Sequence, residues 1–135
     1  MKIVRTTSFT YPEHFSETVL VDAPEYSDRE DFLDAAFEYG EEILEPDQFD
    51  GGQDVGFTFV GVFQGVPRVL EFEWRAEGFE KFLGEFDRFA ERVDLATLPS
   101  DYRQSDMPQI DVLYETEQAH AARLAAEADR RNQCR

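Results

Sequence analysis

Two neighbouring apolar segments, residues 56–64 and 68–74, constrain the fold more than any other part of this sequence. The first is apolar at almost every position, which is typical of a central strand that is covered on both faces. The second alternates apolar and acidic residues, which predicts a strand with one exposed face and with Pro67 near its start or on an edge. Gln64 and Gly65 lie between the two segments and predict a turn. The core is therefore expected to form around a sheet.

Further strands are predicted toward the two ends of the chain. Residues 2–11 and 17–22 are rich in β-branched and aromatic residues, and Pro12 separates them. They are expected to form a hairpin around residues 12–16. Residues 110–114 are predicted as another strand or as the start of a helix, and the preceding residues, 95–108, as a loop.

The first helix is predicted over residues 27–45. Ser27 and Glu30 form a capping box at its start, in which the hydroxyl accepts from a free N–H and the carboxylate returns to the cap. Pro46 ends the helix. Gly40 weakens it by about 1 kcal/mol relative to alanine. Apolar side chains fall at helical spacing along one face, namely Phe32, Leu33, Ala36, Phe37, Tyr39, Ile43 and Leu44.

Two more helices are predicted, over residues 77–93 and 116–131. The outer face of the first of these mixes acidic and basic residues, as an ordinary solvated helix does. The last helix is alanine-rich with a thin apolar stripe, and three alternatives are open: it docks weakly, pairs with a second copy of the chain to form a homodimer, or frays. The order of elements predicts an α+β fold, with an antiparallel sheet of four to five strands and two to three helices on one face.

The bulk composition fits one domain over residues 1–135. The chain is 41% hydrophobic and holds thirteen phenylalanines, which supply a core. No apolar run reaches the roughly 18 residues of a membrane span. The only cysteine, Cys134, has no partner for an internal disulfide, which fits a reducing compartment. The protein is expected to be cytoplasmic.

Negative charge is concentrated in one part of the chain. Residues 13–54 hold fifteen carboxylates and one cation, Arg29, so that they carry a net charge of −14 out of −17 for the whole protein. A protein that is acidic only for solubility should spread its charge, whereas one that binds a basic partner should concentrate it. The same charge repels nucleic acid and anionic membranes, so that neither is a predicted partner.

The acidic residues of the first helix form a row, Glu30, Asp34, Glu38 and Glu42, with a spacing of four residues. The helix carries about one carboxylate per 3.5 Å, close to the phosphate density of a DNA strand. Like charges at this spacing repel each other, and no lysine is interspersed. The predicted partner-binding residues are Asp28, Glu30, Asp31, Asp34, Glu38, Glu41, Glu42, Glu45, Asp47, Asp50 and Asp54.

Three hypotheses account for this pattern. The first is a non-enzymatic inhibitor that occupies the basic nucleic-acid-binding surface of a partner protein. In charge and size alone, such a protein is similar to DNA-mimic inhibitors of phages, which act on restriction or CRISPR systems, and to immunity proteins of nuclease toxins. The second is a binding or structural domain of a salt-adapted organism, because Lys2 and Lys81 are the only lysines. The third is an enzyme or ligand-binding domain whose site is assembled from scattered residues.

Motifs for catalysis, metals or cofactors are not recognised, and none of these is predicted. His14 and His120 are far apart in the sequence and are expected at the surface, although a histidine and a carboxylate can still meet in space. Residues 47–54 supply carboxylates and glycines that could be read as a calcium loop. They lack the EF-hand order, so a turn is the preferred interpretation.

Overall fold

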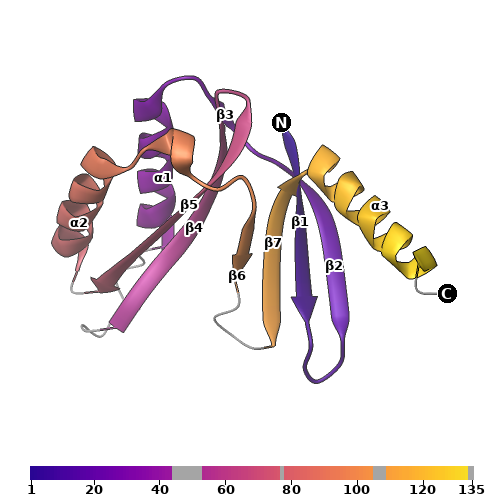
Figure 1. Cartoon of the computed structure of the whole chain (residues 1–135). Helices are drawn as coiled ribbons and strands as arrows, with labels where there is room; N and C mark the ends of the chain where they lie inside the picture. Colours follow the sequence, from indigo (N-terminus) through magenta and orange to yellow (C-terminus); the bar gives the residue numbers. More distant parts are fainter. Residues whose placement is uncertain (44–52, 77, 105–108, 134–135) are drawn as a thin grey trace. The chain divides into compact units, whose positions relative to one another are not determined.

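The computed structural model describes residues 1–43, 53–76, 78–104 and 109–133 (Figure 1). Within these ranges the protein has three α-helices and two sheets, which confirms the predicted α+β class. The chain divides into two compact units, Met1–Pro24 with Ser100–Arg135, and Glu25–Pro99. Each unit is described by itself, and the organisation as one domain stays a prediction.

The first unit contains a four-stranded antiparallel sheet in the order β2-β1-β7-β6. The hairpin predicted from the N-terminal sequence is confirmed, with Val4 opposite Leu20. Residues 110–114, predicted as a strand or the start of a helix, form part of a strand. The loop predicted over residues 95–108 is wrong in part, because three of its residues pair with β7. The strands are β1 (Lys2–Phe9), β2 (Phe15–Asp22), β6 (Tyr102–Gln104) and β7 (Ile110–Thr116).

A single helix, α3 (Glu117–Gln133), follows directly on β7 and contacts β1 and β7. Thr116 ends the strand and caps the helix, since its hydroxyl accepts a 2.9 Å hydrogen bond from the Ala119 N–H. None of the α3 side chains is buried. The thin apolar stripe thus docks the helix only lightly.

The second unit contains a three-stranded sheet in the order β3-β4-β5, with two helices (Figure 1). The turn between β4 and β5 is confirmed: Gln64 and Gly65 both have positive φ, 53° and 78°, as a two-residue hairpin turn requires. Pro67 lies in β5 at the edge of the sheet, where no N–H is needed. The elements are β3 (Glu25–Tyr26), α1 (Arg29–Ile43), β4 (Gln53–Phe63), β5 (Val66–Ala76), α2 (Phe79–Arg92) and a 3-10 turn, η1 (Leu95–Thr97).

Aromatic rings fill the space between this sheet and both helices. Phe57 pairs with Phe72 and Phe59 with Leu70 across β4 and β5, so these side chains share one face. That face packs against Phe32 of α1, whose ring lies 5.3 Å from that of Phe59, and against α2. Val69 on the other face is also buried, although the alternating pattern predicted exposure there. Both helices therefore lie on one face of the sheet, side by side.

Candidate partner-binding surface

The acidic residues of α1 are exposed to solvent, as the sequence predicts. Every predicted carboxylate in the described part of the helix and its cap is exposed, and Asp54 is exposed on β4. No basic residue occupies the last turn of α1, which holds two of these carboxylates. Glu45, Asp47 and Asp50 lie outside the described residues, as does most of the calcium loop considered above. The exposed residues are Asp28, Glu30, Asp31, Asp34, Glu38, Glu41, Glu42 and Asp54.

Asp28 begins the helix in place of Ser27, so the predicted capping box is wrong. The Asp28 carboxylate accepts a 3.1 Å hydrogen bond from the Glu30 N–H, and its carbonyl accepts the first helical bond, from Phe32. Both residue types cap helices well, but a negative carboxylate gains more from the positive end of the helix dipole. One predicted partner-binding residue thus also has a structural role.

Arg29, the one cation of the acidic stretch, is directed at the neighbouring helix. Its guanidinium donates to the backbone carbonyls of Ala90 and of Val93, the latter at 2.9 Å, at the end of α2. The carbonyl end of a helix attracts positive charge, so this contact caps α2. The same guanidinium lies 3.7 Å from the Glu30 carboxylate. Arg29 therefore joins the start of α1 to the end of α2.

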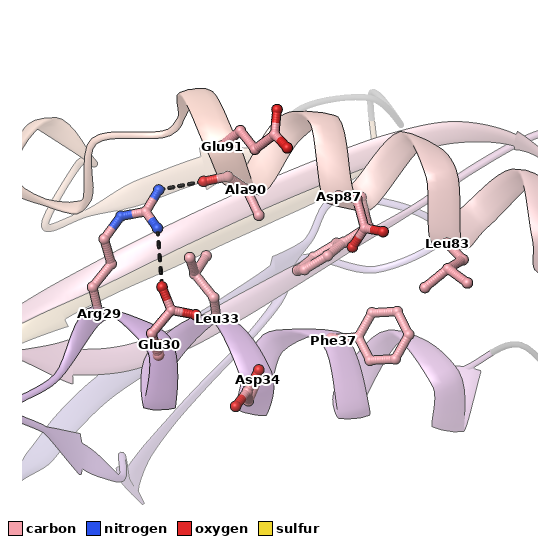
Figure 2. A pocket seen from close by; sticks show the side chains of 10 residues that line it. Arg29, Glu30, Leu33, Asp34, Phe37, Leu83, Asp87, Ala90 and Glu91 are labelled. Atoms are coloured by element: carbon pink, nitrogen blue, oxygen red, sulfur yellow. Dashed lines mark hydrogen bonds and ion pairs between the residues drawn. The ribbon is translucent and has the colours of Figure 1, made fainter.

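A groove of about 470 Å³ runs between the two helices (Figure 2). Apolar side chains from both helices form its floor, and Figure 2 shows Leu33, Phe37 and Leu83 between the two ribbons. Carboxylates stand on both sides: two come from α1 and two from α2. The lining residues are Arg29, Glu30, Leu33, Asp34, Phe37, Leu83, Phe86, Asp87, Ala90 and Glu91.

Asp87 and Glu91 are the residues that the sequence reasoning missed. The outer face of α2 is predicted to mix acidic and basic residues, yet these two exposed carboxylates line the groove. The basic side chains Arg88 and Arg92 line a different hollow, beside β5. At 100° per residue, positions 87 and 91 fall on one side of the helix and positions 88 and 92 on another. A helical projection of the sequence would therefore have separated the two carboxylates from the two arginines.

The other side of α1 affects Tyr26 of β3. Burial raises the pKa of the Tyr26 phenol above its ordinary value, and the nearby carboxylates Glu38 and Asp31 raise this pKa further. The Tyr26 ring packs edge-on against Phe32, with centroids 5.6 Å apart. The acidic face therefore extends across α1, from the groove to β3.

A second cluster of charged groups lies between β7 and α3. Glu115 is only 5% exposed, and its carboxylate lies 2.6 Å from His120 Nδ1 and accepts from the Arg123 guanidinium at 2.9 Å. Arg123 also donates to Glu127 at 3.1 Å. His120 is thus half-buried and partnered, which corrects the expected surface position, whereas His14 is exposed as predicted.

This cluster anchors the helix. Burial opposes ionisation of Glu115, but the hydrogen bonds from Arg123 and His120 outweigh it and hold the pKa of Glu115 below its ordinary value. Moving α3 away from β7 would leave the buried Glu115 carboxylate without its partners, which is costly. This cost explains how α3 stays on the sheet without a buried apolar side chain.

In the part of the chain that the structure describes, no three histidine, cysteine or acidic side chains are grouped as a metal ion would require. None of the described helices combines the length and the apolar character that crossing a membrane demands. Comparison with protein families, curated proteins and solved structures found no match to this chain.

Proposed function

We propose that this protein is a non-enzymatic inhibitor that binds the basic nucleic-acid-binding surface of a partner protein and presents carboxylates in place of phosphates. The observation that carries the proposal is the exposed row Glu30, Asp34, Glu38 and Glu42 on a single helix, with no basic side chain among them. A regular helix fixes these charges about one turn apart. Electrostatic attraction would speed association with a basic partner and disfavour acidic ones.

The stability of α1 accounts only for the carboxylates of its first turn, Glu30 and Asp31, which the positive end of the helix dipole favours. Glu41 and Glu42 lie in its last turn, where the negative end of the helix dipole disfavours them by about 0.3–1 kcal/mol each. The one cation of the stretch, Arg29, donates to the end of α2 and pairs only with Glu30 of the row. Among the described residues, Asp34, Glu38 and Glu42 have no basic partner. Carboxylates that destabilise the end of their own helix are expected where they serve a partner.

The proposal is tested by affinity capture from the native host at about physiological salt, with three baits. The first bait is the wild type, and the second carries E30Q/D34N/E38Q/E42Q. The third, E13Q/E17Q/E71Q/E73Q, removes the same number of exposed carboxylates elsewhere. A basic nucleic-acid-binding protein should be recovered with the wild type and the third bait but not with the second. Short duplex DNA should release it, because the two compete for one surface.

Two results contradict the proposal. Equal recovery by the three baits would place the binding surface off α1, and a captured protein that still binds DNA would exclude mimicry. Salt adaptation of the host, the alternative hypothesis, instead predicts that no basic protein is recovered. It also predicts that the free energy of unfolding rises steeply with salt, equally in all three baits.

A further inference from the structure

We infer that the groove between α1 and α2 receives arginine side chains of the partner, with the aliphatic stem on the apolar floor and the guanidinium between the two acidic rims. The inference rests on the proposed function, because it takes the partner to be basic. It adds the place where the arginine binds and extends the binding surface to α2.

The rims of the groove supply matching charge from two helices. Glu30 and Asp34 stand on α1, and Asp87 and Glu91 stand on α2. In the described part of the chain, Asp34, Asp87 and Glu91 take part in no ion pair, and all three are exposed. A guanidinium has five N–H donors in a planar fork, so that it can bind a carboxylate on each rim. A lysine ammonium is a point charge and lacks this fork.

The floor of the groove matches the rest of an arginine side chain. Leu83 is 39% exposed, so a partner has apolar area to cover there. Phe37 is half-buried and stacks on Phe82 with ring centroids 5.2 Å apart, which fixes its position. Arginine packs its methylene stem on apolar surface and its guanidinium on aromatic rings.

The groove carries an excess of negative charge, because Arg29 is too little to balance its carboxylates. Four carboxylates line the groove beside this single cation. The Arg29 guanidinium donates to the backbone carbonyls at the end of α2, and Glu30 is the one groove carboxylate with which it forms an ion pair. The volume of about 470 Å³ lies within the range of small-ligand sites and suits side chains rather than a whole helix.

The test measures binding of octa-arginine and octa-lysine to the full chain by fluorescence anisotropy at about physiological salt. The wild type should bind octa-arginine about fivefold more tightly than octa-lysine. The α2 rim variant D87N/E91Q should lose about fivefold in affinity for octa-arginine. The control E71Q/E73Q, with the same change in charge on β5, should lose less than about twofold.

A floor variant separates shape from charge. L83Q should weaken octa-arginine binding about threefold, at low and high salt alike, because apolar contact is not screened. V66Q, which replaces an apolar residue of similar exposure on β5, outside the groove lining, should bind as the wild type does. Fluorescence of Trp74, the only tryptophan, checks that each variant with a substitution in the second unit is folded.

The outcomes distinguish this inference from the proposed function. If the wild type binds neither peptide, both fail. A further variant, E38Q/E42Q, removes two carboxylates of α1 that do not line the groove. If it weakens binding while D87N/E91Q and L83Q match their controls, the acidic helix is the binding surface and the groove inference is overturned. Equal affinity for octa-lysine and octa-arginine also overturns it, because the groove would then respond to charge alone.

Discussion

Gly40 of α1 and Phe82 of α2 are in direct contact: a Cβ built on Gly40 would lie 2.7 Å from Phe82 Cζ. The same Cβ would lie 2.8 Å from Phe57 Cε1, on the sheet. Both neighbours are buried and belong to the aromatic core, so neither ring can move away freely. Glycine at this position therefore allows α1 to approach the sheet and α2 at once, which outweighs its low helix propensity.

G40A should lower the free energy of unfolding by about 1–2 kcal/mol, because overpacking exceeds the gain in helix propensity. The matched control is G84A in α2, where a Cβ would meet nothing within 4 Å. That substitution should raise the free energy of unfolding by about 0.5–1 kcal/mol. Urea unfolding followed by Trp74 fluorescence measures both. A stabilising G40A would show that the rings yield easily.

Replacement of Arg29 should separate stability from binding. R29Q removes the hydrogen bonds to the carbonyls of Ala90 and Val93 and should cost about 1–2 kcal/mol of unfolding free energy. R29K keeps the positive charge but not the planar fork of N–H donors. Its free energy of unfolding should lie between those of R29Q and the wild type. R29Q also makes the surface more negative, so its affinity for octa-arginine should not fall. Weaker binding by a folded R29Q would assign Arg29 to partner contact.

Local patterns account for the elements that the sequence predicts correctly. The β4–β5 hairpin follows from its alternation and its two-residue turn, and the exposed carboxylates of α1 follow from helical spacing. The short strands β3 and β6 were missed because each is defined by a distant partner. Glu25 and Tyr26 pair in parallel with the end of β4, and nothing in those two residues indicates a strand.

Only one of the two acidic rims of the groove could be predicted from the sequence. The α1 rim of the groove is visible as a charge run, whereas the α2 rim requires a helical projection and the knowledge that the two helices are neighbours. The contact of Glu115 with His120 depends on where β7 ends and α3 begins, which the sequence left open. Tertiary placement, rather than residue type, decides these two features.

Acid should loosen α3 through Glu115. The pKa of Glu115 is lower in the folded protein than in the unfolded chain. The carboxylate therefore contributes fully to stability above the ordinary glutamate pKa of about 4.3. This contribution is lost as the pH falls through the lower pKa of the folded state. Hydrogen exchange of residues 117–133, corrected for intrinsic rates, should show constant wild-type protection from about pH 7 to about pH 5 and a fall below about pH 4.

Two variants assign that effect to the buried carboxylate. E115Q should show reduced protection of α3 at neutral pH and a smaller further loss in acid, because the ionised partner of Arg123 is gone. E127Q removes only the outer contact of Arg123 and should behave almost as the wild type does. An acid response of E115Q equal to that of the wild type would assign the loosening to other carboxylates.

Titration of Tyr26 should report the charge on α1. Burial raises the pKa of this phenol first, and Glu38 and Asp31 raise it further, so D31N/E38Q should lower the pKa of Tyr26 while leaving it above 10.0. Carbon NMR of ring-labelled tyrosine follows the phenol. E71Q/E73Q, with the same change in charge on β5 of the same unit, should change the pKa of Tyr26 less, because neither of these carboxylates is among those that raise it. Bound octa-arginine should lower the pKa of Tyr26 in the wild type but hardly in D31N/E38Q, because the peptide neutralises those two carboxylates. A pKa that does not respond to the peptide would mean that arginine binds away from this side of α1.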